Sequence, residues 1–91
     1  MAESVRRHVV VRGRVQGVFF RDSLRERAET AGVAGWAKNR DDGAVEVVLE
    51  GSPGAVEEVL SFCESGPPRA DVEDLDVSDE QPEGLSGFSV R

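Results

Sequence analysis

The chain has 91 residues, 32% of them charged, and a formal net charge of −7. This length predicts a single domain, residues 1–91, with a modest core, and the acidic balance argues against nucleic acid as a partner because nucleic-acid binding needs a basic surface. No apolar run approaches the roughly 20 residues of a membrane span, and the start of the chain lacks the apolar region of a signal peptide, so we expect a cytoplasmic protein with no membrane partner.

The first predicted element is a strand. After a short disordered start, residues 1–4, the β-branched segment Val5 to Arg12 predicts a strand that places Val5, Val9 and Val11 on one face. His8, the only histidine, falls on the other face. We therefore expect His8 to be a surface strand residue and not a general base.

A loop and a helix follow. The loop begins at Gly13, and apolar residues then recur at steps of four, four and three, which is the spacing of a helix from Phe20 to Ala31. Gly32 stands at the expected end of this helix, as a C-terminal cap.

The middle of the chain predicts a hairpin. Residues 33–39 form the next strand, and Arg40-Asp41-Asp42-Gly43 supplies a turn, since Asp-Gly is a strong hairpin signal. Residues 44–50 alternate cleanly, with Val45, Val47 and Leu49 facing inward and Glu46 and Glu50 facing outward. Gly51 is expected to break this strand.

The second helix begins with Ser52 as N-cap and Pro53 at its first position. Its apolar stripe consists of Val56, Val59, Leu60 and Cys63, with Phe62 flanking, and residues 66–68 end it. Cys63 is the only cysteine, so no internal disulfide can form, and we expect it to be a buried apolar residue and not a nucleophile.

The chain ends with two more predicted strands. Residues 70–77 are acidic and change phase between Val72 and Leu75, which indicates a β-bulge. A loop with Pro82 and Gly84 leads to a short strand, residues 85–90. The element order predicts an α+β, ferredoxin-like α/β sandwich: βαββαβ with an additional short C-terminal strand, and two helices packed on one face of a mainly antiparallel sheet.

The loop between the first strand and the first helix has the features of an anion site. The first N–H groups of a helix have no intrahelical partner, and the helix dipole adds partial positive charge there. Gly13 and Gly17 permit backbone angles that let successive N–H groups converge, and Arg21 offers a planar fork of donors. The basic first half of the chain agrees with a small anionic ligand: residues 1–40 hold nine Lys/Arg and four Asp/Glu, against two and fourteen in residues 41–91.

Two stretches carry a family resemblance. Gly13-Arg14-Val15-Gln16-Gly17-Val18-Phe19-Phe20-Arg21, followed by Gly35-Trp36-Ala37-Lys38-Asn39 and Gly43-Ala44-Val45, resembles the acylphosphatases. The resemblance implies hydrolysis of the carboxyl-phosphate bond of small acyl phosphates. It assigns phosphate binding to the Arg21 side chain and to the backbone amides of Gln16, Gly17, Val18, Phe19, Phe20 and Arg21, and the orientation of the attacking water to Asn39.

The sequence leaves some alternatives open. An asparagine before a turn often serves the turn itself, and a non-catalytic acyl-phosphate-binding regulatory module of the same fold would keep the same loop. An RNA-binding module would need exposed aromatics on the central strands, which are absent from residues 5–12 and 44–50.

The expected chemistry also makes some components unnecessary. A carboxylate leaving group needs no general acid, and the sequence offers no metal-binding cluster, so we expect that the reaction requires no metal and no cofactor. We expect a monomer, because the chain is small and shows no evident interface. Arg40, Asp41 and Asp42 depart from the family pattern, and we expect both aspartates in the solvent-facing turn.

Overall fold

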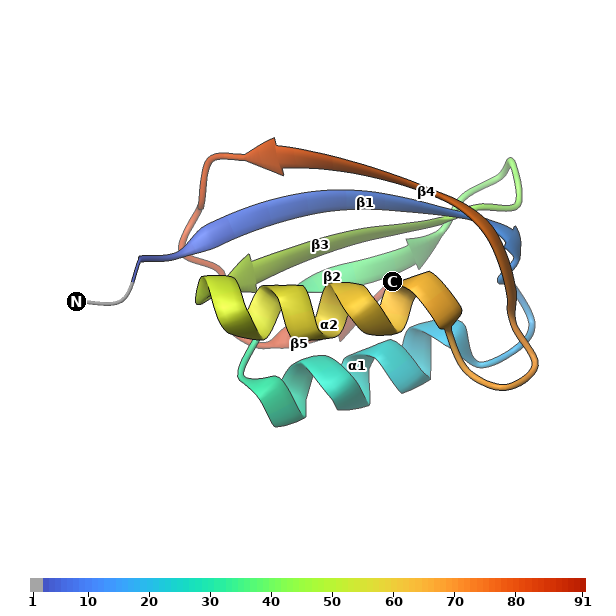
Figure 1. Cartoon of the computed structure of the whole chain (residues 1–91), viewed down its shortest axis with the longest axis horizontal. Coiled ribbons are helices and arrows are strands. Elements are labelled where there is room, and N and C mark those ends of the chain that lie inside the picture. The colour runs from blue at the N-terminus through green and yellow to red at the C-terminus, as the bar shows by residue number, and fades with distance from the viewer. Residues whose placement is uncertain (1–2) are drawn as a thin grey trace.

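The computed structural model describes residues 3–91. Within these residues, two helices lie side by side on one face of a sheet, and the opposite face of the sheet carries no helix (Figure 1). The elements are, in chain order, β1 (Val5–Arg14), α1 (Phe20–Ala31), β2 (Ala34–Asn39), β3 (Val45–Gly51), α2 (Pro53–Ser65), β4 (Asp71–Glu80) and β5 (Phe88–Val90).

The sheet has five strands in the order β4-β1-β3-β2-β5. β1 is antiparallel to both β3 and β4, and β2 is antiparallel to β3. Among the strand pairs in the described part of the chain, only β2–β5 is parallel. The predicted ferredoxin-like fold is therefore confirmed. Since β3 lies between β1 and β2, no ladder of backbone hydrogen bonds joins those two strands directly.

The core lies between the sheet and the helices. Phe20, Leu24 and Ala28 from α1 and Val56, Val59 and Cys63 from α2 are buried. They cover the alternating valines and leucine of β1 and β3: Val9, Val11, Val45, Val47 and Leu49. Leu24 is fully buried, and shortening such a side chain to alanine costs about 2–5 kcal/mol of stability.

Most element boundaries agree with the sequence pattern. The predicted bounds of α1 are confirmed, and Gly32 caps it in the left-handed region. The bulge is also confirmed: Arg12 pairs with Asp74 but Gly13 pairs with Val72, so Glu73 is the extra residue. Residues 1–2 of the predicted disordered start lie outside the described residues, and Glu3 and Ser4 precede β1.

Several strand ends differ from the prediction. β1 continues to Arg14 and β4 to Glu80, because each strand pairs with the other over this length. β5 begins only at Phe88, and Gly51 does not break β3, since it is the last residue of that strand and pairs with Val5. Glycine has a low propensity for strands, but Gly51 remains extended because the neighbouring strand β1 pairs with it.

The prediction for Glu50 was wrong. It alternates away from the helix side as expected, yet only 4% of it is exposed. Glu50 Oε1 accepts a hydrogen bond from the backbone N–H of Glu83, and Oε2 accepts from Gly84 and Leu85. The connection from β4 to β5 folds over this end of the sheet and covers the carboxylate.

The uneven charge along the chain has a structural counterpart. Arginines of β1 face carboxylates of the edge strand β4: Arg6 with Glu80, Arg7 with Asp79 and Arg12 with Asp76. Much of the basic charge of the first strand is thus balanced across one strand pair. Within residues 3–91, no helix is long and apolar enough to cross a membrane.

Candidate functional site

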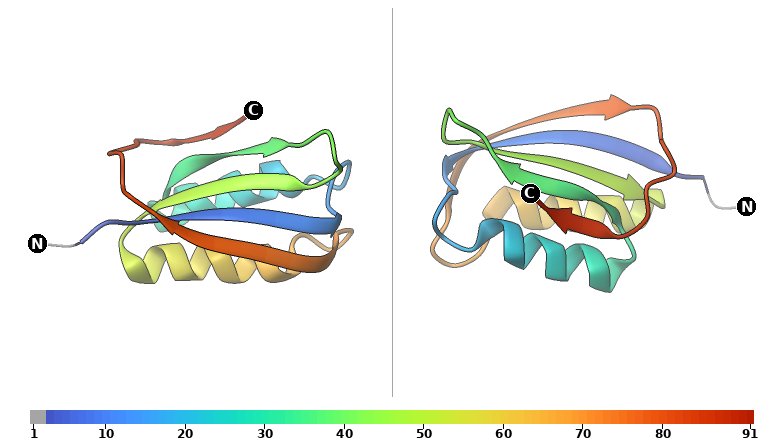
Figure 2. Two further views of the ribbon diagram at one scale, coloured as in Figure 1. Left: turned by 90° about the horizontal axis from the view of Figure 1, so that it is seen from above. Right: turned by 180° about the vertical axis from the view of Figure 1, so that it is seen from behind.

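Three connections meet at one end of the sheet. The β1–α1 loop, the β2–β3 turn and the α2–β4 connection lie at the same end of the molecule in all views (Figures 1 and 2). A cavity of about 340 Å³ opens there, lined by residues of the loop, the first turn of α1 and the end of β2: Val15, Gly17, Phe19, Phe20, Arg21, Asp22 and Asn39. Arg21 and Asn39, which are distant in the sequence, therefore share one cavity.

The loop enters α1 through two left-handed residues. Gly17 has φ 73°, and Phe19, the N-cap residue, has φ 63° and ψ 27°. A left-handed conformation costs a non-glycine residue about 1–3 kcal/mol, and such residues cluster at functional sites. The first helical bond runs from Ser23 N–H to Phe19 O, so the N–H groups before it have no intrahelical partner.

Gly13 has a different role from the one predicted. It lies inside β1, opposite Val72, and does not belong to the loop. A Cβ atom at Gly13 would stand 2.2 Å from the backbone oxygen of Asp71, so glycine is required by the close approach of β1 and β4. Among the two predicted loop glycines, only Gly17 shapes the cavity.

Arg21 lies in the first turn of α1 and lines the cavity. Its Nη1 donates a hydrogen bond to the backbone oxygen of Arg91, with a separation of 2.6 Å. A guanidinium has five N–H donors, so this bond anchors the group and leaves the other donors for a ligand. Asp22 also lines the cavity, but its side chain is 63% exposed, and its Oδ1 lies 3.8 Å from Arg25 Nη2.

Asn39 ends β2 and is exposed at the cavity. The turn that follows is closed by other groups: Asp42 Oδ1 accepts from Ala44 N–H at 3.1 Å, and Arg40 N–H donates to Ala44 O at 2.8 Å. The backbone N–H of Ala44 together with Arg40 and Arg12 lowers the pKa of the Asp42 carboxyl, despite some opposing desolvation. Because Asp42 and the backbone close the turn, the Asn39 amide is left for another partner.

The residues after Asn39 lie as expected for a solvent-facing turn. Asp41 and Asp42 are both exposed. Arg40 Nη2 lies 3.0 Å from Asp42 Oδ2, so the charge of Arg40 is balanced within the turn. Because its charge is paired there, Arg40 offers little net attraction to an anionic ligand.

Gln16 contributes a side chain that the sequence reasoning missed. Its Nε2 donates hydrogen bonds to Arg40 O at 2.8 Å and Ala44 O at 2.9 Å. Only its backbone amide was predicted to matter. No local signal indicates these bonds, because both acceptors are backbone atoms of a turn more than twenty positions away.

Other reactive side chains stand away from the cavity. His8 Nε2 lies 2.7 Å from Glu46 Oε2, and this contact with His8 lowers the pKa of the Glu46 carboxyl. Cys63 is buried, and desolvation raises the pKa of its thiol to about 12, so it stays protonated at neutral pH. In residues 3–91, no cluster of three His, Cys, Asp or Glu side chains could hold a metal ion.

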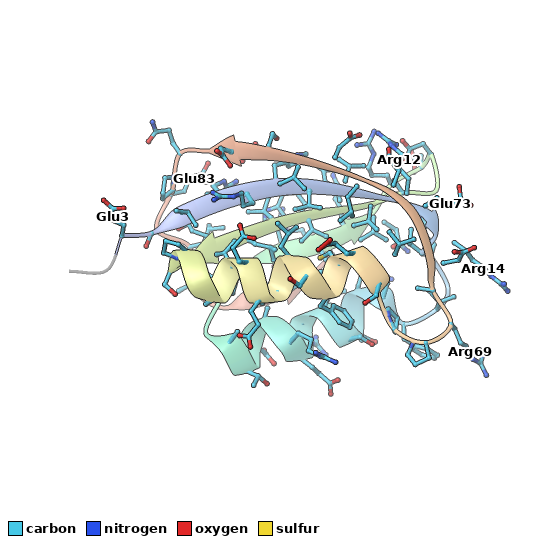
Figure 3. The ribbon with its side chains drawn as sticks, in the orientation of Figure 1. Glu3, Arg12, Arg14, Arg69, Glu73 and Glu83 are labelled. Atoms are coloured by element: carbon cyan, nitrogen blue, oxygen red, sulfur yellow. The ribbon has the colours of Figure 1, made fainter. Side chains whose placement is uncertain are left out.

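Arginines and carboxylates both lie at this end of the molecule, and Glu73 is found there beside Arg14 (Figure 3). Figure 3 shows Arg14 and Arg69 pointing outward at the end where the loop and the turn lie. A larger cavity, about 730 Å³, lies along α1 and α2, but its lining includes Glu26, Glu29 and Glu58. Three carboxylates make that cavity a poor anion site, so the smaller cavity is the better candidate.

Comparisons with known proteins agree on one family. The family model described as Acylphosphatase matches residues 7–90. An acylphosphatase from Gloeobacter violaceus is 54% identical over 90 residues, which cover 99% of this chain and 97% of that protein. The solved acylphosphatase of Coxiella burnetii superimposes with a TM-score of 0.92 at 39% identity, covering 97% of this chain and 93% of that one. The Bacillus subtilis acylphosphatase structure gives a TM-score of 0.92 at 38% identity, over 96% and 98% of the two chains.

Proposed function

The chain belongs to the acylphosphatase family and hydrolyses the carboxyl-phosphate bond of small acyl phosphates, and from this premise we propose which residues carry the reaction. Arg21 and the backbone amides of Gln16 to Arg21 hold the phosphoryl group, and Asn39 orients the attacking water. The observation that supports this assignment is the shared cavity, which is lined by Arg21, Asn39 and the loop at the N-terminus of α1.

The proposed chemistry follows from what these groups can do. Backbone N–H groups and a guanidinium stabilise negative charge on phosphoryl oxygens, more so as charge develops in the transition state. A water held by the Asn39 amide attacks phosphorus, and the bond from phosphorus to the acyl oxygen breaks. The leaving group is a carboxylate with a pKa of about 4, so no acid has to protonate it. The products are a carboxylate and inorganic phosphate.

We also propose the setting in which this site works. Residues 1–91 form one domain that acts as a cytoplasmic monomer, with a small acyl phosphate as its ligand and no metal or cofactor. The single core between sheet and helices supports one domain, and a protonated, buried Cys63 is compatible with a reducing compartment.

The role of Arg21 is tested by replacing it with glutamine and with lysine. Charged hydrogen bonds contribute roughly 1.5–3 kcal/mol each, so losing a bidentate pair should lower kcat/KM for acetyl phosphate by at least about 100-fold. Arg21→Lys should also fail, because a point charge cannot reproduce the planar fork. Arg25→Gln, in the same helix but outside the cavity lining, is the matched control and should retain activity. Phosphate release reports the rate, and a fully active Arg21→Lys variant would contradict the assignment.

The role of Asn39 is tested by Asn39→Ala. Removing a side chain that holds only the water should lower kcat by about two orders of magnitude or more and leave the affinity for inorganic phosphate nearly unchanged. Circular dichroism checks that the variant is folded. If the variant loses phosphate affinity and keeps kcat, the roles of the two residues are reversed. If it changes neither, Asn39 serves the turn.

A further inference from the structure

The Gln16 side chain joins two parts of the site that the sheet does not join. Gln16 belongs to the loop after β1, and its two acceptors, Arg40 O and Ala44 O, flank the turn that begins after Asn39. Both protons of the side-chain amide are used, at 2.8 Å and 2.9 Å. The phosphate loop and the end of β2 are therefore cross-linked by one side chain.

The turn does not need this amide in order to close. Ala44 O already accepts from Arg40 N–H at 2.8 Å, and Arg40 O accepts from Gly43 N–H at 3.2 Å. A carbonyl oxygen has two lone pairs, so Gln16 occupies the second acceptor position of each group. Removing the amide would leave neither oxygen without a partner, and the turn should persist.

What the amide adds is a fixed distance between loop and turn. β1 and β2 are separated by β3, so the ladder aligns Asn39 with the loop only through an intervening strand. A bound water must lie in line with phosphorus and the leaving oxygen, and a displacement of about 1 Å can cost about 100-fold in rate. A short polar link between the two parts reduces that freedom.

We propose that the Gln16 side chain is a positioning residue that holds Asn39 in register with the phosphate loop. This inference rests on the roles proposed above for Arg21, the loop and Asn39. It differs from the phosphate contact of the Gln16 backbone amide, which any residue at this position would keep.

The test is a set of four variants assayed with acetyl phosphate: Gln16→Met, Asn39→Ala, the double variant and Gln81→Met. Methionine has the length of glutamine and no donor, and Gln81, an exposed residue before Pro82, is the matched control. Gln16→Met should lower kcat by about 10- to 100-fold. Its inhibition constant for inorganic phosphate should stay within about threefold of the wild-type value, because the loop N–H groups remain.

The double variant separates positioning from a general structural effect. If Gln16 acts through Asn39, then Gln16→Met should change kcat by no more than about twofold in the Asn39→Ala background. Three results would each overturn the inference. The kcat losses of the two single variants could multiply in the double variant, or kcat could be unchanged in Gln16→Met. The phosphate inhibition constant of Gln16→Met could also rise by the same factor by which its kcat falls. Circular dichroism verifies folding, and Gln16→Ala is the second variant if the methionine variant does not fold. Failure of the proposed function itself would show differently, as an Asn39→Ala variant with wild-type kcat.

Discussion

Replacing Glu50 with glutamine should destabilise the protein, although the sequence pattern places this residue on the outer face. The carboxylate accepts backbone hydrogen bonds from Glu83 at 2.9 Å, Gly84 at 2.7 Å and Leu85 at 2.9 Å, and Arg6 Nη1 lies 3.4 Å away. A glutamine keeps one oxygen, so its NH₂ group must face at least one of these donors. These contacts hold the segment that leads into β5 and on to Arg91, whose oxygen anchors Arg21.

The cost can be estimated from the donors that lose their acceptor. A buried donor without a partner costs about 1–3 kcal/mol, and one or two of the three N–H groups are affected. Arg6 keeps its bond to Glu80, at 2.8 Å, so its charge is not left unpaired. One donor at the lower value and two donors at the higher value bracket the effect. We therefore expect Glu50→Gln to lower the free energy of unfolding at pH 7 by about 1–6 kcal/mol, against the roughly 5–15 kcal/mol typical of a protein.

The effect should also depend on pH. Burial alone raises the pKa of Glu50, but the N–H groups of Glu83, Leu85 and Gly84, together with Arg6, outweigh it and the pKa is lowered. A group with a lowered folded-state pKa contributes stability that is fully present above its unfolded pKa, about 4.5, and is lost as the pH falls through the folded pKa. The difference between wild type and Glu50→Gln should therefore shrink as the pH falls below about 4.5.

Urea unfolding between pH 7 and pH 3 measures this difference, with Glu57→Gln as the control. Glu57 is exposed on α2, so its replacement should change the free energy of unfolding by no more than about 0.5 kcal/mol. If Glu50→Gln loses less than about 1 kcal/mol at pH 7, or its loss is independent of pH, the carboxylate does not stabilise the β4–β5 connection as described.

Three further predictions concern the site and the sheet. Hydrolysis should continue in EDTA, because backbone amides and Arg21 stabilise the negative charge of the phosphoryl group. A loss of activity in EDTA that magnesium or zinc restores would contradict this. Inorganic phosphate should raise the apparent KM and leave kcat unchanged, because the loop N–H groups and Arg21 bind phosphoryl oxygens and not the acyl part. Purely noncompetitive inhibition would indicate that the anion binds elsewhere. Gly35→Ala should lower the free energy of unfolding in urea by at least about 3 kcal/mol, because its Cβ would stand 1.8 Å from Val48 O and the backbone φ is 146°. Gly54 in α2 is the control: a Cβ there would meet nothing within 4 Å, so Gly54→Ala should be neutral or stabilising.

Elements with a strong local pattern could be predicted from the sequence. The spacing of Phe20, Leu24 and Ala28 predicted the bounds of α1, and the Asp42-Gly43 turn and the bulge in β4 were also predicted. The helix and the turn depend on contacts between close neighbours in the chain, and the phase change that indicated the bulge lies within the residues of β4 itself. The family motifs likewise pointed to Arg21 and Asn39 as site residues, and both line one cavity in the structure.

The ends of strands depended on the neighbouring strand. β1 extends to Arg14 because β4 pairs with it, and Gly51 stays in β3 because Val5 pairs with it. Gly13 was predicted to shape the loop, but the backbone of Asp71 decides its role. A strand's own residues do not reveal how far its partner reaches, so the pattern left these boundaries open.

The order of the elements, their inward faces and the motifs that identify the family could all be predicted from the order of the residues. The surroundings of the polar side chains, in contrast, depend on contacts that form when the chain folds. Glu50 is buried by residues 33 to 35 positions later in the chain, and the Gln16 amide donates to carbonyl groups 24 and 28 positions away. Hydrophobic periodicity reports which face of an element is covered by the core, whereas a polar side chain takes whatever partner the folded chain brings within about 3 Å.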